Sequence, residues 1–212
     1  MVQDYTAARE NMVENQVRTN DVTNLAIQDA MRLVERERFC PPGKEHLAYA
    51  EAQIEYAPGW FMMAPRDVAK LLEAVDPKPG EKALAIAAPY AASVMVKMGV
   101  EVVARMPAET AGPMGAALQP YCTAVELGSP ALTSEWGPFD VVVLEGAVPK
   151  ALDVWIAALA VGGRLGVIER TGPVGKARVY IKAQDGTIAS REVFDATPAL
   201  IKGFEPAPAF AF

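Results

Sequence analysis

Apolar residues recur at helical spacing in three segments of the first third of the chain. These segments are residues 5–17, residues 25–34 and a stretch that begins at Pro65. Residues 21–23 offer an N-cap for the second segment, and Pro65 suits the first turn of the third. The pattern therefore predicts three helices, with a loop-rich stretch at residues 44–59 between the second and the third.

Beyond a stop rich in Pro and Gly at residues 76–80, short apolar runs alternate with segments that suit helices. The pattern predicts a strand at 82–87, a helix at 90–98, strands at 101–104, 122–126 and 139–145, a helix at 148–160 ended by Gly162 and Gly163, and a strand at 164–169. The run at 139–145 is almost continuously apolar, which is typical of a central parallel strand covered on both faces. Strand-like runs on either side of Gln184, Asp185 and Gly186 predict a closing hairpin.

Together these elements predict an α/β fold. We expect a doubly wound, mostly parallel sheet with an N-terminal helical extension and a C-terminal antiparallel hairpin. With 212 residues, the chain is long enough for one domain with a sizeable core. We expect a single domain over residues 1–212, made of a helical region (1–76), a sheet core (80–204) and a tail (205–212) whose aromatic side chains dock on the surface.

Composition and charge exclude several classes of function. Hydrophobic residues make up 51% and charged residues 22%, which is the balance of an ordinary soluble globular protein. The net charge of −6 and the scattered Lys and Arg residues argue against a nucleic-acid partner. No apolar stretch reaches the roughly 18 residues of a membrane span, and residues 1–18 lack the apolar core of a secretion signal.

The same composition predicts a cytoplasmic protein without a metal site. Cys40 and Cys122 lie in different segments and are expected to be reduced thiols, as is usual in the cytoplasm. The single histidine, His46, lies in the loop-rich stretch and is expected at the surface rather than as a general base. One histidine and two distant cysteines do not make a set of metal ligands.

Several segments, in the same order and at the same spacing, resemble those of one known family. They are residues 8–18 (ARENMVENQVR), 22–39, 48–50 (AYA), 137–140 (GPFD), 145–149 (EGAVP) and 159–165 (LAVGGRL). As a set, they resemble the protein-L-isoaspartate O-methyltransferases, over residues 5–204. The resemblance implies a Rossmann-like class I methyltransferase fold with S-adenosylmethionine as its cofactor. It also implies methyl transfer to the α-carboxylate of isoaspartyl residues in a protein or peptide.

Three functional elements implied by the resemblance differ in this chain. The glycine-rich cofactor turn of the family corresponds to residues 84–90, which hold no glycine, and Pro89 removes a backbone donor there. The acidic residue that binds the cofactor ribose corresponds to Ala104, whose side chain offers no acceptor. The serine of the substrate loop corresponds to Met63, two residues before Pro65.

Position alone therefore assigns the candidate site, and no catalytic residue is assigned. The residues expected around any remaining cofactor site are Ala87, Tyr90, Ala104, Glu126 and Glu145. Met63 and Pro65 are expected on the substrate side. Glu145, at the end of a strand, fits either a ligand contact or a solvated carboxylate.

The sequence thus predicts a protein-L-isoaspartate O-methyltransferase-like protein whose methyl transfer is weak or lost. The alternative is a catalytically inactive homologue that acts as a protein-binding or regulatory module through its sheet edge or emptied pocket. A third possibility is a pocket for a different small ligand beneath Trp60 and Met63. For the apolar cluster at residues 60–63, the pattern favours packing over the sheet edge, because Met and aromatic side chains usually fill cores.

Overall fold

The computed structural model of the chain describes residues 4–122, 124–132 and 136–205. Within these residues the helices are α1 (Thr6–Met12), α2 (Leu25–Leu33), α3 (Pro65–Val75), α4 (Pro89–Lys97), α5 (Ala111–Leu118) and α6 (Asp153–Ala157). A π-helical turn, Val13–Val17, extends α1. The strands are β1 (Ile54–Ala57), β2 (Trp60–Met62), β3 (Lys82–Ile86), β4 (Glu101–Met106), β5 (Ala124–Leu127), β6 (Phe139–Val148), β7 (Leu159–Glu169), β8 (Gly175–Lys182) and β9 (Ile188–Ala196).

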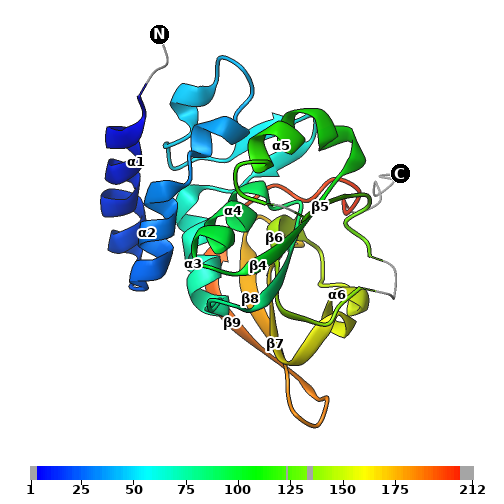
Figure 1. The fold of residues 1–212 in the computed structure, drawn as a ribbon. Coiled ribbons are helices and arrows are strands. Elements are labelled where there is room, and N and C mark those ends of the chain that lie inside the picture. Colours follow the sequence, from blue (N-terminus) through cyan, green and yellow to red (C-terminus); the bar gives the residue numbers. More distant parts are fainter. Residues whose placement is uncertain (1–3, 123, 133–135, 206–212) are drawn as a thin grey trace.

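The strands of the described residues form two sheets. β1 and β2 make an antiparallel pair, and the others make a seven-stranded sheet of order β5-β4-β3-β6-β7-β8-β9. Neighbouring strands are parallel from β5 to β7, whereas β8 and β9 are antiparallel additions. The chain runs outward from β3 to β4 and β5, then returns to β6 on the other side of β3 (Figure 1). The doubly wound α/β fold expected from the sequence is confirmed.

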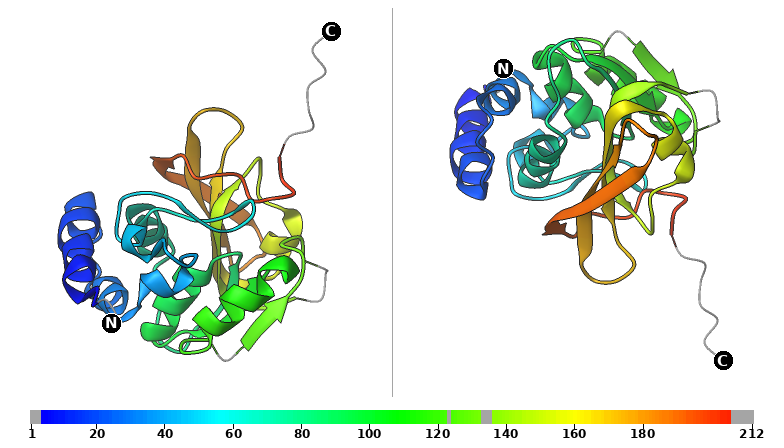
Figure 2. Two further views of the ribbon diagram at one scale, coloured as in Figure 1. Left: turned by 90° about the horizontal axis from the view of Figure 1, so that it is seen from above. Right: turned by 90° about the horizontal axis from the view of Figure 1, so that it is seen from below.

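The helices form layers on this sheet. α3, α4 and α5 cover one face, and α6 lies on the opposite side (Figure 2). The N-terminal pair, α1 and α2, packs outside α3 and α4 rather than on the sheet itself. The N-terminal region is therefore an extra helical layer added to the α/β core, as the sequence predicts.

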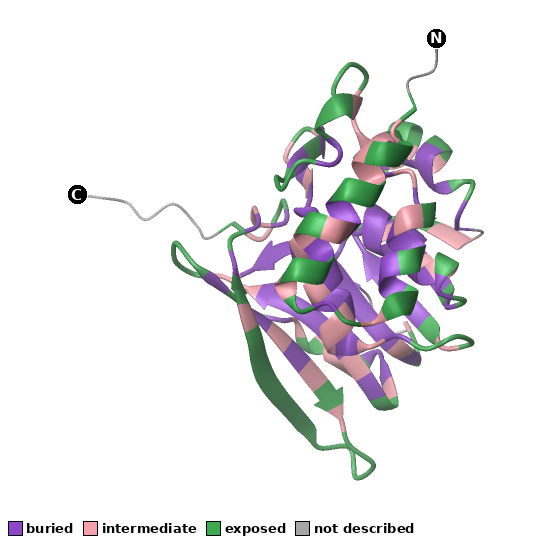
Figure 3. Cartoon of the chain, turned by 90° about the vertical axis from the view of Figure 1, so that its left-hand side faces the viewer, coloured by how far each residue is buried: buried purple, intermediate pink, exposed green. Residues whose placement is uncertain are grey.

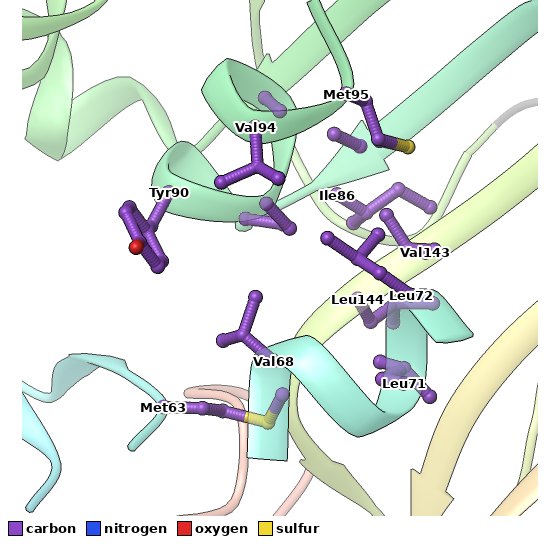
Figure 4. Packing of buried hydrophobic residues seen from close by; sticks show 14 of the residues in the cluster. Met63, Val68, Leu71, Leu72, Ile86, Tyr90, Val94, Met95, Val143 and Leu144 are labelled. Carbon is purple, nitrogen blue, oxygen red and sulfur yellow. The ribbon is translucent and has the colours of Figure 1, made fainter. Parts of the chain in front are cut away.

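Helix α3 shows how the apolar pattern fixes one of these layers. Pro65 occupies the first turn, where its missing N–H breaks no helical hydrogen bond. Val68, Leu71, Leu72 and Val75 are all buried, on a helix that contacts β7, β8 and β9 (Figure 4). Full burial of each such side chain is worth about 1.5–3 kcal/mol. Packing of this face therefore holds α3 on the sheet.

Arg164 of β7 ties the end of α3 to the sheet. Its Nε donates to the carbonyl of Val75 at 2.8 Å, and its Nη2 donates to the carbonyl of Asp76 at 2.7 Å. Its Nη1 pairs with a carboxylate oxygen of Glu81 at 2.7 Å. The guanidinium thus supplies hydrogen-bond donors to carbonyls that are left without partners where a helix ends.

Two predictions about the segment that connects β6 to β7 are wrong. The helix expected over residues 148–160 is only the short α6, because β6 runs on to Val148 and β7 already begins at Leu159. Gly162 and Gly163 accordingly lie within β7 and do not end a helix. Pairing between β6 and β7, a contact that local periodicity does not report, decides the conformation here.

Two predictions about the N-terminal region are also corrected. The stretch at residues 44–59 contains β1, so it is not only loop, and its pairing with β2 lies beyond the reach of a local pattern. The N-cap of α2 is Asn24 rather than a residue at 21–23. Its Oδ1 accepts from the amide of Ala26 at 2.9 Å, while Thr23 donates instead to Glu73 of α3.

The C-terminal hairpin is confirmed and projects from the body of the molecule. Most of β9 is exposed and forms the outer edge of the sheet, although α3 contacts both strands of the hairpin (Figure 3). Within the described ranges, no helix is long and apolar enough to cross a membrane. Cys40 and Cys122 are both free thiols. The expectation for the tail falls almost wholly on residues 206–212, which lie outside the described residues.

Candidate functional site

The carboxyl ends of β3, β4, β5 and β6 meet at one edge of the sheet, where ligands bind in open α/β folds. The β1–β2 hairpin contacts β6 at this edge, and the C-terminal segment runs beside the extension of β6. The amide of Ala147 donates to the carbonyl of Ala199, and the amide of Ile201 donates back to the carbonyl of Ala147, both at 2.8 Å. Gly146 makes this approach possible, since a Cβ there would lie 2.6 Å from the Ile201 side chain.

The turn after β3 is closed and buried. Ala87 adopts a left-handed conformation with φ of +49°, and its amide donates to the carbonyl of Arg105 at 2.9 Å. Ala88 and Tyr90 are fully buried, and Pro89 begins α4. The backbone thus makes the tight turn that glycine normally makes, but with a Cβ at every position.

The side chain of Glu145, from β6, lies against the beginning of α4. One carboxylate oxygen accepts from the amide of Ala91 at 2.6 Å, and the other accepts from the amide of Met63 at 3.2 Å. The residue is only 1% exposed. The amides in the first turn of a helix have no partner within the helix, and the helix dipole favours a negative charge there. Glu145 therefore caps α4 from another strand of the sheet.

Opposing influences act on the protonation of Glu145. Burial raises the pKa of Glu145 to about 7, and this is the largest influence. The amides of Ala91, Met63 and Tyr90 and the charge of Arg36 all act in the other direction. The solvated strand-end carboxylate that the sequence allowed is thus not what the structure contains.

A second buried charge, Arg36, lies beside this carboxylate. Its Nε donates to the carbonyl of Ala48 at 2.8 Å, and its Nη2 donates to the carbonyl of Met63 at 2.6 Å. Its guanidinium carbon lies 4.5 Å from the centre of the Tyr90 ring, a cation–π geometry. Within the described residues, neither Nη1 of Arg36 nor the hydroxyls of Tyr90 and Tyr56 have a hydrogen-bond partner.

Met63 links Arg36 and Glu145 through its main chain. Its side chain is buried, and it lies at the same end of the core as Tyr90 and Val68 (Figure 4). Its amide donates to Glu145 and its carbonyl accepts from Arg36, so both main-chain groups are already engaged. We use the name buried cluster for Arg36, Met63, Tyr90 and Glu145.

The remaining candidates do not join the buried cluster. Ala104 is buried inside β4, where it pairs with Ala85 and Val125, and Met106 is the last residue of that strand. Glu126 is exposed on β5, the edge strand. The structure therefore brings Tyr90 and Glu145 together at the start of α4. Ala104 lies in the strand next to Ala87, whose amide bonds to the carbonyl of Arg105, and Glu126 lies apart on the edge strand.

A cavity of about 400 Å³ opens over the ends of β4 and β5. Trp60, Glu109, Lys202 and Ser129 are among the residues that line it. Glu109 accepts from the Trp60 indole at 3.1 Å and pairs with Lys202 at 3.2 Å, so these groups cross-link β2, the turn after β4 and the C-terminal segment. Trp60 and Met62 are themselves buried, as the core interpretation of residues 60–63 expects.

The family model described as protein-L-isoaspartate(D-aspartate) O-methyltransferase (PCMT) matches residues 7–108. A protein-L-isoaspartate O-methyltransferase from Methylorubrum extorquens (strain PA1) is 33% identical over 186 residues, which cover 82% of this chain and 78% of that protein. The chain belongs to the protein-L-isoaspartate O-methyltransferase family. A second member, from Methylorubrum populi, is 34% identical over 80% of this chain and 82% of its own length.

Solved structures agree on the fold of this protein-L-isoaspartate O-methyltransferase homologue. A putative protein-L-isoaspartate O-methyltransferase from Plasmodium falciparum, in complex with S-adenosyl-L-homocysteine, superposes with a TM-score of 0.75 over 92% of this chain and 98% of that one. A further protein-L-isoaspartate O-methyltransferase superposes with a TM-score of 0.74 over 92% of this chain and 66% of that one. Their identities of 15% and 19% carry the likeness of fold alone.

The turn after β3, together with the buried cluster, does not fit S-adenosylmethionine in this conformation. Ala87, Ala88 and Tyr90 fill the turn after β3 and are at most 1% exposed. The amide of Ala91 at the start of α4 is already bound by Glu145, and Pro89 supplies no N–H. The cavity of about 400 Å³ lies further along the edge, over β4 and β5. The chain's own atoms therefore occupy the place next to β3.

Sequence reasoning missed two members of this site. Arg36 lies within residues 22–39, which carry the family resemblance, and a charged residue beside a helical pattern is normally solvated. Tyr56 lay in the stretch expected to be loop. The pattern at residues 34–36 does not reveal that Arg36 is buried, since its partners are carbonyls 12 and 27 residues away. His46 is exposed, as expected.

Proposed function

We propose that this protein is a protein-L-isoaspartate O-methyltransferase homologue in which methyl transfer from S-adenosylmethionine to isoaspartyl carboxylates is weak or lost. Membership of the family supports that chemistry as the ancestral one. The observation that carries the proposal is the carboxylate of Glu145, which is bound to the amide of Ala91 at the start of α4. A cofactor has to displace this contact before it can lie against β3.

The substrate side supports the same conclusion. Methyl transfer depends on holding the acceptor oxygen in line with the methyl group, so the substrate carboxyl needs fixed donors. Met63, at the position of the family's serine, offers no polar side-chain donor, and its amide is already engaged by Glu145. The same side chain engages the donors on both sides of the site. The amides of Ala91 and Met63 both bind Glu145, so neither is free to bind a ligand.

We further propose that the partner is a protein or peptide and that the compartment is the cytoplasm. The substrate named for the family is an isoaspartyl residue of a protein, which supports the first point. The two free thiols, Cys40 and Cys122, support the second, because unpaired cysteines are usual in reducing compartments.

Calorimetric titration with S-adenosylmethionine and S-adenosylhomocysteine tests the proposal, with a relative that keeps the glycine-rich turn as control. We expect no heat up to millimolar ligand while the control binds. Binding at micromolar strength, followed by methylation of an isoaspartyl peptide, would contradict the proposal. Absence of binding directs the search to protein partners, the role of the inactive homologue.

A variant with Ala87→Gly and Ala88→Gly separates the turn from the rest of the site. Glycine restores backbone freedom at φ of +49° but leaves the Glu145 carboxylate in place. We therefore expect this variant to bind S-adenosylmethionine no better than the parent chain in the same titration. A gain of ten-fold or more would show that the turn alone excludes the cofactor.

A further inference from the structure

We propose that the buried cluster is an anion site occupied in cis, in which Glu145 acts as a tethered ligand. The inference deepens the proposed function by naming the class of ligand that fits the place next to β3, namely a small carboxylate. Removing the Glu145 side chain should leave a site that a free carboxylate enters.

The donors around Glu145 make up a set that binds a carboxyl group. Burial outweighs them and raises the pKa of Glu145 to about 7, so the carboxylate form predominates only above that pH. Helix α4 presents the amide of Ala91, and the loop before α3 presents the amide of Met63, to the two oxygens of one carboxylate. Amides at the start of a helix and a neighbouring guanidinium are the groups with which proteins usually bind carboxylates and phosphates. Among the described residues, Glu145 supplies the carboxylate that these amides bind.

An unpartnered donor belongs to a residue that is linked to this set through Met63, whose carbonyl accepts from Arg36 and whose amide donates to Glu145. Arg36 is fully buried, yet its Nη1 has no partner within the described residues, and no ion pair joins it to Glu145. The hydroxyl of Tyr90, whose ring the guanidinium stacks on, is also without a partner. Burial of unpaired donors is costly, so a ligand that reaches them gains more than one that bonds the amides alone.

The cluster also explains how the turn after β3 holds its shape without glycine. Ala87 is in a left-handed conformation that is unfavourable for an L-residue, and it persists only where the surroundings enforce it. Glu145 fixes the helix that follows this turn. The carboxylate therefore closes the site and keeps the strained turn in place.

Rescue of a cavity variant by acetate tests the inference. Glu145→Ala removes the atoms beyond Cβ, and these correspond closely to acetate. At pH 8 and constant ionic strength, with chloride as the replaced salt, we expect the variant to melt several degrees below the parent chain. Added acetate should then raise its Tm in a saturable manner, by about 5 °C at twenty times the dissociation constant.

Glu169→Ala is the matched control. Glu169 also accepts from a backbone amide, that of Ala151, and from the hydroxyl of Tyr180, but it lies outside the buried cluster. Acetate should change the Tm of this variant and of the parent chain only by the small, non-saturating effect of the salt itself. An equal response in all three proteins would overturn the inference.

If Glu145→Ala does not fold without ligand, the same experiment is read as refolding yield. Acetate should then restore the folded fraction measured by circular dichroism, whereas chloride should not, and no effect of acetate on yield would also overturn the inference. This outcome is independent of the proposed function. If the parent chain bound S-adenosylmethionine and methylated an isoaspartyl peptide, the proposed loss of methyl transfer would be refuted, while saturable acetate rescue would still establish the anion site.

Discussion

Replacing Glu145 with Gln should change how the stability of the protein depends on pH. Burial raises the pKa of this carboxyl in the folded chain to about 7, against an ordinary value of 4.5. The groups that face it are the guanidinium of Arg36, the hydroxyl-bearing rings of Tyr90 and Tyr56, and the amides of Ala91 and Met63. Gln keeps the volume of Glu and removes the titration.

The sign follows from proton binding. Between pH 4.5 and 7 the folded chain holds a proton on Glu145 more tightly than the unfolded chain does, so stability rises as the pH falls. A difference from 4.5 to about 7 corresponds to about 3 kcal/mol of unfolding free energy. The contribution of Glu145 to the unfolding free energy is therefore complete only below pH 4.5 and is lost as the pH rises through 7.

Urea unfolding at half-unit steps from pH 5 to pH 8 measures this effect, because the free energy of unfolding is obtained at each pH. The parent chain should gain about 2.5 kcal/mol of unfolding free energy relative to Glu145→Gln as the pH falls from 8 to 5. The comparison cancels the titration of all other groups. Free energies for the two proteins that run parallel from pH 5 to pH 8 would refute the argument that burial dominates at Glu145.

Three further substitutions test contacts that hold the fold. Arg36→Met should lower the free energy of unfolding in urea by about 2–4 kcal/mol, because two buried carbonyls lose their donors. The control is Arg38→Met, which removes an exposed ion pair and should lower it by less than about 1 kcal/mol. Equal losses for the two variants would contradict this account. Arg164→Ala should cost about 2–3 kcal/mol at pH 7. Burial acts to raise the pKa of Glu81, but its hydrogen bonds with Arg164 and the Lys78 amide and the charge of Arg164 together outweigh burial and lower the pKa. The cost should therefore be smaller in acid, where Glu81 becomes protonated, and an unchanged pH dependence would count against this role. Trp155→Phe should lower Tm by about 2–6 °C, because the buried indole donates to a carbonyl at 2.9 Å, and a neutral result would mean that the bond contributes nothing net.

The sequence determined the parts of this protein that local patterns encode. The continuous apolar run of β6, the Pro65 start and apolar face of α3, and the hairpin of β8 and β9 all follow from periodicity and turn chemistry within a few residues. The absence of glycine from the turn after β3 was also visible, and it led to the expectation of weak or lost methyl transfer. Each of these features depends only on neighbours along the chain.

Tertiary structure alone decided what fills the candidate site. The sequence placed Glu145 at a strand end but left open whether water or a ligand meets it, since the donors that bind it come from Met63 and Ala91, 82 and 54 residues away. Arg36 is buried because carbonyls of two separate loops converge on it. Buried polar groups are matched across the fold rather than along the chain, because desolvation penalises them until a partner arrives from another element. The sequence therefore revealed that the cofactor turn lacks glycine. Only the fold revealed that the Glu145 carboxylate binds the start of the helix that follows this turn.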